Sequence, residues 1–425
     1  MALSLKSLVC ATLLITSGVE AQETGTVSGQ DIVVGQQYMF QSDQLEREQV
    51  LQIALPANYD EAETQRYPVL YVLDGQWQFL EAVSFVRRLA GVREIPDVIV
   101  VGLPRTLGEN QFYHAGSAGT DKMLDFIEQT AQPFVSNKFR TTGQDIVAGW
   151  AYTGGFALHA LTTRPQLFDA FIMSSPFPIA DYATDFENTS YQLVENFPDT
   201  LEEDKFLYFG ADVSERIVLE GARKLNDLLS QKAPSNLTWA YEELTGERHV
   251  TTAHRLLYSG LRSLFEDFGD LAFDSVAALN EFGGLEGVKN YYRKRAEKYD
   301  VSPRVVDSTV FRLARIAMDE ENLELFDRLR ANFDPYFSRV RFSWSNRYAA
   351  LYLKHNRHRV AVQMYERLVA RFPSSVGAYA GLGEAYSLAG RSVQAIKMYE
   401  RAVDLAKDKK DERLNELQEK LAALK

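Results

Sequence analysis

One segment, residues 145–158, sets the tightest limit on how this chain can fold. Its sequence is DIVAGWAYTGGFAL, in which an apolar run predicts a buried strand, Gly149 predicts a sharp turn, and a following glycine pair opens a helix. This is the layout of a nucleophile elbow, G-x-S-x-G, where a strained strand-to-helix turn holds a serine hydroxyl above a sheet. Here Ala151 occupies the serine position and Thr153 the second glycine position. Because alanine has no hydroxyl, it cannot form an acyl-enzyme.

A shifted reading frame would make Thr153 the nucleophile, since residues 151–155 are a degenerate copy of the same motif. The flanking residues argue against this frame. The strand-end glycine lies two residues before Ala151, and Phe156 begins the helix where an ungapped fit requires it. We therefore assign the nucleophile position to Ala151 and keep Thr153 as the alternative.

From residue 27 to about residue 270 the chain alternates strand-like and helix-like runs, which is typical of an α/β layer fold. Helical patterns such as residues 120–134 separate the strands. Continuous apolar strands between helices indicate a mostly parallel sheet that is covered on both faces. The predicted strands are residues 67–73, 97–102, 145–149, 168–175, 205–210 and 238–244.

Charge and cysteine content exclude several classes of function. The net charge of −12 argues against a nucleic-acid partner, which would require a basic face, and against an anionic membrane surface. The single cysteine, Cys10, lies in the first residues. The six histidines form no compact ligand set, so we expect no metal and no cofactor.

The first 21 residues are typical of a signal peptide. Lys6 supplies a short positive region, residues 8–15 are apolar, and small residues flank a cleavage site before Gln22. The apolar stretch is too short to span a bilayer, so we expect no membrane span. The mature chain would lack cysteine, and an exported protein without disulfides fits a bacterial periplasm or the medium.

The last third of the chain repeats at a spacing of 34 residues, with one copy at 342–373 and the next at 376–407. AVQMYERLV at residues 361–369 corresponds to AIKMYERAV at residues 395–403, and Tyr352 corresponds to Tyr386. Both copies resemble tetratricopeptide repeats, which are pairs of helices. Residues 271–341 are predicted to be a helical connector that contains a degenerate further unit, and residues 408–425 a capping helix.

The α/β part resembles a known family. The runs RYPVLYVLDG, IPDVIVVGLPRT, TDKMLDFIEQ, PQLFDAFIMSSP and HRLLYSGLRSLF, together with the elbow, are similar to the Putative esterase family. This is the esterase D-like branch of the α/β-hydrolases, which includes siderophore esterases. The resemblance implies an α/β-hydrolase fold over residues 27–270, with the chain order elbow, acid, histidine.

The resemblance also implies roles for individual residues. It places the catalytic histidine at His249 and the acid at Asp212 or Glu215, which stay open as alternatives. The oxyanion hole would use the backbone N–H groups of Gln76 and Tyr152. One departure lies after the second strand, where an Arg-Asp segment of the relatives is replaced by the run LGENQFYH.

Two classes of function remain open at this stage. One is a non-catalytic or weakly active protein that binds a small ester-like ligand and offers its repeats to a protein or peptide partner. The other is an active carboxylic-ester hydrolase that uses Thr153, Tyr152 or a water activated by His249. The repeats could equally pack on the hydrolase domain or mediate self-association.

Overall fold

A computed structural model of the chain describes residues 31–105, 112–113, 117–177 and 199–425. The helices and strands of the described residues all lie within Gly35–Lys425. The predicted signal peptide, residues 1–21, and Cys10 lie outside the described residues.

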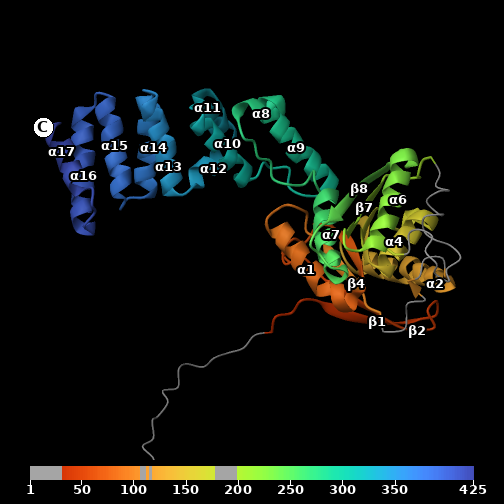
Figure 1. The fold of residues 1–425 in the computed structure, drawn as a ribbon. Helices are drawn as coiled ribbons and strands as arrows, with labels where there is room; N and C mark the ends of the chain where they lie inside the picture. The colour runs from red at the N-terminus through yellow and green to blue at the C-terminus, as the bar shows by residue number, and fades with distance from the viewer. Residues whose placement is uncertain (1–30, 106–111, 114–116, 178–198) are drawn as a thin grey trace, which may run out of the picture. The chain divides into compact units, whose positions relative to one another are not determined.

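One sheet carries the α/β part (Figure 1). Its strands lie in the order β1-β2-β4-β3-β5-β6-β7-β8. β1 pairs antiparallel with β2 and β2 antiparallel with β4, whereas the pairings from β4 to β8 are parallel. The prediction of a mostly parallel sheet is therefore confirmed. The strands are β1 (Gln36–Ser42), β2 (Arg47–Ala54), β3 (Tyr67–Leu73), β4 (Ile99–Leu103), β5 (Thr141–Trp150), β6 (Ala170–Ser174), β7 (Lys205–Asp212) and β8 (Leu237–Leu244).

Strands β1 and β2 are absent from the sequence prediction. They form a hairpin in which Ser42 pairs with Arg47 and Gln36 pairs with Ile53. The inward face of β2 includes a glutamine, Gln49, which is buried beside Leu51 and donates from Nε2 to the Pro104 carbonyl at 3.0 Å. A polar residue at an inward position breaks the alternation of apolar and polar residues by which a strand is recognised.

Helices cover both faces of the sheet, as the handedness of the crossovers requires. The crossover from β3 to β4 through α1 moves the chain in one direction along the sheet. The crossovers from β4 to β5, from β5 to β6 and from β7 to β8 move it in the opposite direction. Right-handed crossovers therefore put α1 on one face and α2, α3, α4 and α6 on the other. α7 contacts α1 and shares its face. The bounds are α1 (Gly75–Gly91), α2 (Ala118–Phe126), α3 (Gln132–Lys138), α4 (Tyr152–Thr163), α6 (Arg216–Lys232) and α7 (His249–Leu264).

A carboxylate pair lies near the start of β5. The Asp145 side chain accepts a hydrogen bond from Gln132 Nε2 at 2.9 Å, and its backbone N–H donates to the Asp169 carboxylate at 2.8 Å. Burial, and then the charge of Asp169, raise the pKa of Asp145 to about 7, although the hydrogen bond from Gln132 opposes them. The folded protein therefore keeps a proton here that the unfolded chain loses near pH 4.

This raised pKa predicts a pH-dependent stability. The native state binds more protons than the unfolded state between about pH 4 and pH 7, so the free energy of unfolding falls as pH rises through that window. We expect Asp145→Asn to stabilise the protein by on the order of 2 kcal/mol at pH 8 and little at pH 4. Urea unfolding at both pH values measures this, with the exposed Asp227→Asn as control. Equal effects at the two pH values would contradict it.

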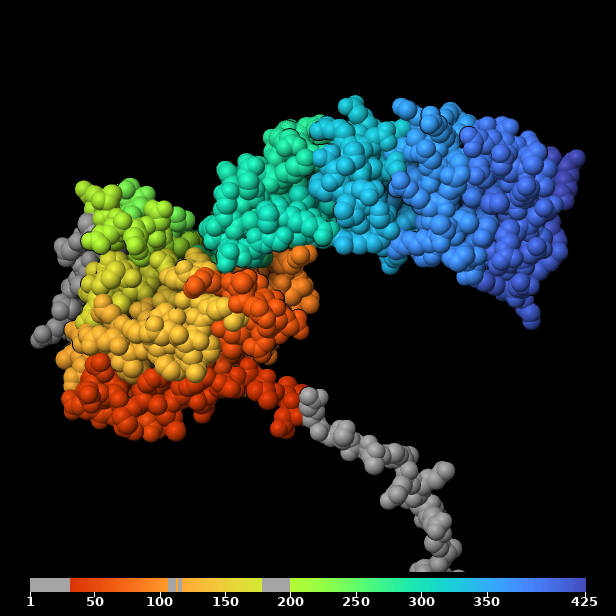
Figure 2. Space-filling model, turned by 180° about the vertical axis from the view of Figure 1, so that it is seen from behind, coloured from red at the N-terminus to blue at the C-terminus, as the bar shows by residue number. Residues whose placement is uncertain are grey.

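The C-terminal part is an array of helices that follow one another in a single row from α8 to α17 (Figures 1 and 2). The helix bounds repeat as the sequence does, because α15 and α16 begin 34 residues after α13 and α14. The array comprises α8 (Val276–Glu281), α9 (Gly284–Tyr299), α10 (Asp307–Asp319), α11 (Leu323–Asn332), α12 (Asp334–Arg339), α13 (Phe342–Lys354), α14 (His358–Arg371), α15 (Val376–Leu388), α16 (Ser392–Lys409) and α17 (Leu414–Ala422).

The upstream unit differs from the later repeats in one helix. α10 and α13 have 13 residues each, but α11 has 10 residues where α14 has 14, and the short α12 follows it. At the other end, Leu417 of α17 is buried against α16, and Leu414, Leu421 and Leu424 pack around it. This leucine stripe covers the last apolar face of the array, as expected of a capping helix.

Two glycines of α15 allow close packing of the repeat helices. A Cβ at Gly383 would lie 3.1 Å from the Tyr399 ring of α16. A Cβ at Gly381 would lie 2.2 Å from Cε1 of Tyr365, a buried residue of α14. The tetratricopeptide pattern identifies Gly383 but not Gly381, because the side chain that requires a glycine at position 381, Tyr365, lies on the preceding helix.

We expect Gly381→Ala to destabilise the array by about 2 kcal/mol, because the buried Tyr365 ring must move to admit a methyl group. The steric strain alone would cost more, but alanine has a higher helix propensity than glycine, and this difference offsets up to about 1 kcal/mol of the strain. Thermal unfolding followed by far-UV circular dichroism measures the loss. Gly91→Ala, where a Cβ meets nothing within 4 Å, is the matched control and should not lose stability. An unchanged midpoint for Gly381→Ala would contradict the packing argument.

Candidate active site

Ala151 lies at the turn between β5 and α4, with φ 53° and ψ −119°. Such a backbone is costly for a residue with a Cβ, by about 1–3 kcal/mol. The turn is tight because a Cβ at Gly149 would lie 2.2 Å from the Thr153 carbonyl oxygen. The geometry therefore has the strained strand-to-helix turn of a nucleophile elbow, with a methyl group at its tip.

Backbone hydrogen bonds hold Ala151 in this conformation. Its N–H donates to the Ser174 carbonyl at 3.0 Å, which ties the turn to the end of β6. Its carbonyl accepts from the Gly155 N–H in α4 and from the Phe177 N–H after β6, each at 3.0 Å. Because the neighbouring strand and helix fix the turn, the conformation does not depend on the side chain at position 151.

Thr153 is buried in the first turn of α4, and its hydroxyl has partners on the inner side of the elbow. Its Oγ1 donates to Oδ2 of Asp74 at 2.8 Å and accepts from the Trp150 N–H at 2.8 Å. Among the described residues no hydrogen bond joins Thr153 to His249. This geometry favours Ala151 over Thr153 at the nucleophile position.

Asp74 joins the elbow to the turn that is predicted to supply the oxyanion hole. This fully buried residue follows β3 in a left-handed conformation, with φ 56°. Its Oδ1 forms an ion pair with Nε of Arg105 and accepts from Gln76 Nε2 at 3.2 Å, while Oδ2 accepts from Thr153. The carboxylate thus connects three segments that meet beneath the candidate site. Sequence reasoning did not assign it a role.

We expect Thr153→Val to destabilise the protein by about 1–3 kcal/mol, because the similarly shaped side chain leaves the buried Asp74 carboxylate without one donor. Thr153→Ser keeps the hydroxyl and serves as the matched control. Guanidinium unfolding of the two variants measures the difference. If the valine variant were as stable as the serine variant, the hydroxyl would not hold Asp74 in solution.

His249 and Glu215 form an acid–histidine pair. His249 is the first residue of α7, and its Nδ1 contacts Oε1 of Glu215 within hydrogen-bond distance. The Glu215 side chain is 7% exposed and that of His249 is 44% exposed. Burial raises the pKa of Glu215, but hydrogen bonds from His249, Ser175 and the Asp212 N–H outweigh it and lower the pKa below its usual range. The carboxylate therefore stays ionised and can orient the imidazole.

Asp212, the other predicted acid, lies nearby but does not contact the histidine ring. Its Oδ1 accepts from the Ser214 N–H and its Oδ2 from the Glu247 N–H, each at 2.9 Å. A hydrogen bond from the Ser214 side chain, and then the N–H groups of Ser214 and Glu247, lower the pKa of Asp212 against the effect of burial. Asp212 therefore ties the loop after β7 to the loop that carries His249, and the structure brings Glu215 to the histidine.

Aromatic rings form one wall of the site. The Trp150 ring lies on His249 with centroids 4.7 Å apart, and its Nε1 donates to the His249 carbonyl at 2.7 Å. Trp77 meets Trp150 edge to face at 6.3 Å and is exposed. No sequence pattern indicates this stack, because Trp150 occupies an unconstrained position of the motif and Trp77 lies far away along the chain.

The predicted oxyanion amides belong to two helix N-termini. Gln76 is the second residue of α1, and Tyr152 is the first residue of α4. Backbone N–H groups in the first turn of a helix point toward its N-terminal end, so amides at such positions are of the kind that can bind an oxyanion. Most of the rewritten loop, residues 107–111 and 114, lies outside the described residues.

Within the described residues, no group of three or more histidine, cysteine, aspartate or glutamate residues is arranged to hold a metal ion. None of the helices in the same part of the chain is long and apolar enough to cross a membrane.

Comparison with known families matches both parts of the chain. Residues 42–243 match the family described as Putative esterase, and residues 352–421 match the tetratricopeptide repeat. Among curated proteins, a siderophore triacetylfusarinine C esterase of Aspergillus fumigatus is 31% identical over 150 residues, covering 30% of this chain and 50% of that protein. A siderophore enterobactin esterase of Emericella nidulans is 31% identical over 136 residues, covering 25% of this chain and 45% of that protein. The chain thus spans about half the length of these relatives.

Solved structures show the same fold. An IroE-like serine hydrolase of Shewanella oneidensis is 24% identical with a TM-score of 0.52, covering 70% of this chain and 99% of that one. An uncharacterised protein of Capnocytophaga ochracea is 15% identical with a TM-score of 0.54, covering 90% of this chain and 99% of that one. The chain therefore carries an esterase-family α/β-hydrolase domain, similar to siderophore esterases, followed by tetratricopeptide repeats.

Proposed function

We propose that this protein is an exported member of the esterase family that has lost serine catalysis and acts as a ligand-binding or scaffold protein. The observation that carries the proposal is the methyl group at the elbow. Ala151 has the strained φ and ψ of the turn but no hydroxyl. The nearest alternative hydroxyl, that of Thr153, is buried and donates to Asp74.

The size of the rate loss that follows from a missing nucleophile supports a non-catalytic protein. Removing the nucleophile of a serine triad costs about 10⁶-fold in kcat, and binding and oxyanion contacts leave roughly 10³–10⁴-fold over water. A protein that retains those contacts can still hold an ester-like ligand, because binding does not require the nucleophile.

One observation favours an active hydrolase as the second candidate. The pair of Glu215 and His249 is intact, and the pKa of Glu215 is held low. A histidine oriented in this way could activate a water molecule if that water reaches the ester carbonyl. Tyr152, at the start of α4, is the remaining hydroxyl that a direct attack would use.

A chromogenic ester assay separates the two candidates. On purified protein lacking residues 1–21, we expect hydrolysis of short-chain p-nitrophenyl esters to equal that of the His249→Ala variant. Thr153→Ser and Tyr152→Phe serve as further comparisons. Turnover that His249→Ala abolishes would reject the non-catalytic proposal and support a water route. Turnover lost in Tyr152→Phe would support a tyrosine nucleophile.

We propose that the ligand is a small ester of the siderophore type, as the names of the curated relatives suggest. Trp150 lies on His249 and Trp77 adjoins it, so a ligand in the site would change tryptophan fluorescence. Titration with intact and hydrolysed siderophore esters should quench the emission, and Trp150→Phe should remove most of that change. A signal that does not depend on Trp150 would place binding elsewhere.

The repeats and the first residues carry two further parts of the proposal. Tetratricopeptide repeats suggest a protein or peptide partner, and crosslinking of the full chain against a truncation after residue 270 would test this. A chain whose crosslinks are unchanged by the truncation would count against partner binding. Export is tested by fractionation of a bacterial host and by the N-terminal sequence of the exported protein, which we expect to begin at Gln22.

A further inference from the structure

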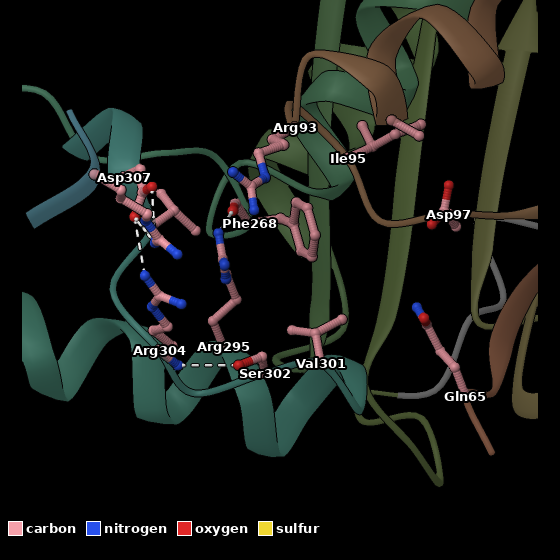
Figure 3. A pocket seen from close by; sticks show the side chains of 13 residues that line it. Gln65, Arg93, Ile95, Asp97, Phe268, Arg295, Val301, Ser302, Arg304 and Asp307 are labelled. Carbon is pink, nitrogen blue, oxygen red and sulfur yellow. Dashed lines mark hydrogen bonds and ion pairs between the residues drawn. The ribbon is translucent and has the colours of Figure 1, made fainter. Parts of the chain in front are cut away.

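A cavity lies away from the candidate active site, beside the start of α10 (Figure 3). It has a volume of about 500 Å³, which is within the usual range of small-molecule sites. Four arginines and two aspartates line it, whereas the chain as a whole carries more acidic than basic residues. The cationic residues are Arg93, Arg295, Arg304 and Arg339.

Two of these arginines share a single carboxylate. Nη2 of Arg304 donates to Asp307 at 3.1 Å, and Nη2 of Arg339 donates to both oxygens of Asp307 at 2.9 Å. Each guanidinium has five N–H donors, and the hydrogen bonds of both groups to Asp307 use Nη2. Asp307 thus balances one of the two positive charges and leaves donors for another oxyanion.

The other two arginines differ from this pair in their surroundings. Arg295 is 6% exposed, packs between the Phe268 and Tyr292 rings, and donates from Nη1 to the Phe268 carbonyl at 3.0 Å. Its Nη1 forms an ion pair with Oδ1 of Asp270 at 3.5 Å, but its Nε is buried without a hydrogen-bond partner. Arg93 is exposed and has no ion pair with any residue in the described ranges. Both side chains line the same cavity (Figure 3).

The start of α10 adds to this positive environment. α10 has 13 residues, and Val306 at its N-cap cannot cap the first N–H groups with a side chain. Val306 and Asp307, at this helix end, both line the cavity. An uncapped helix N-terminus attracts anions, although the Asp307 carboxylate already offsets part of that field.

We propose that this cavity binds the phosphate group of a small organic molecule. A phosphate offers several oxygens and up to two charges, which match separated arginine forks and a helix N-terminus better than a single carboxylate does. The uncharged remainder would contact the apolar part of the lining, which includes Ile95, Phe268 and Val306. This site is independent of ester binding at Ala151.

Calorimetric titration of the full chain with phenyl phosphate, inorganic phosphate and phenol, at constant ionic strength, tests the proposal. We expect both phosphates to bind and phenol not to bind. Tighter binding of phenyl phosphate would assign the site to an organic phosphate, and equal binding would assign it to the free ion. Absence of binding by both phosphates at millimolar concentration would overturn the proposal.

Charge variants locate the binding. Arg93→Gln and Arg304→Gln should each weaken phosphate binding about tenfold or more, because each removes a charged donor. Arg315→Gln removes a charge from the exposed side of α10, far from its N-terminus, and should leave binding unchanged. Thermal unfolding of each variant without ligand checks that it folds. Equal affinity of all three variants would place the anion elsewhere and overturn the assignment.

Discussion

Ala151→Ser should convert this protein from one that fluorophosphonate probes do not label into one that they do. Such probes require an activated hydroxyl, which the wild type lacks at the elbow. The backbone at position 151 is held by bonds from β6 and α4, so a serine should adopt the same strained conformation. We expect the Glu215–His249 pair to accept its proton, because the carboxylate orients the imidazole.

We expect ester hydrolysis to rise by at least about 10²-fold in Ala151→Ser, toward the roughly 10⁶-fold that a serine contributes in a complete triad. The gain depends on His249, so Ala151→Ser combined with His249→Ala should return to the wild-type rate. Thr153 does not require a glycine conformation, because it is not among the described residues with positive φ. The altered motif therefore does not prevent the turn.

Two results would contradict this expectation. Strong labelling of the wild type that Thr153→Ala abolishes would identify Thr153 as a nucleophile. Ala151→Ser without labelling, in a variant that unfolds normally, would mean that the His249 ring or the oxyanion amides are not arranged for catalysis. Mass spectrometry of the labelled peptide distinguishes attachment at residue 151 from attachment at Tyr152.

The sequence was sufficient to predict the parts of the fold that depend on local patterns. Continuous apolar runs predicted the parallel strands, and the 34-residue spacing predicted the paired helices of the array. The predicted helix at residues 120–134 is α2 and α3, joined by a π-helical turn over Ile127–Ala131. Strand β2 was missed because the buried Gln49 interrupts its pattern, and its partner, the Pro104 carbonyl just after β4, explains that burial.

The candidate site was predictable where chain order determines it. The order elbow, acid, histidine limited the acid to Asp212 and Glu215, but these residues are only three positions apart. Which carboxylate meets His249 depends on how the chain turns between β7 and α6, and on hydrogen bonds from Ser175 and Glu247 on distant segments. The same limit applies to Thr153, whose partner Asp74 follows a different strand.

In the Ala151→Ser background, Glu215→Gln should reduce kcat by about 10⁴-fold. Glutamine keeps the size of the side chain but offers an N–H donor or a neutral carbonyl in place of a carboxylate. It can then hold the His249 ring in the wrong tautomer, and it cannot stabilise the imidazolium. The equivalent loss of the triad carboxylate in a serine protease lowers kcat by about 10⁴-fold. The buried position of Glu215 leaves no room for water to replace the charge fully.

Asp212→Asn in the same background is the matched control, because it also neutralises a buried carboxylate at the end of β7. It should lower the free energy of unfolding by about 1–3 kcal/mol, since one backbone donor loses its acceptor, but reduce kcat by about tenfold or less. Steady-state kinetics and urea unfolding of both double variants separate the two effects. If Asp212→Asn cost as much in kcat as Glu215→Gln, the histidine would be oriented by both carboxylates. A Glu215→Gln variant with nearly full activity would instead mean that the engineered serine works through a histidine held by other contacts, such as the Trp150 ring against its face.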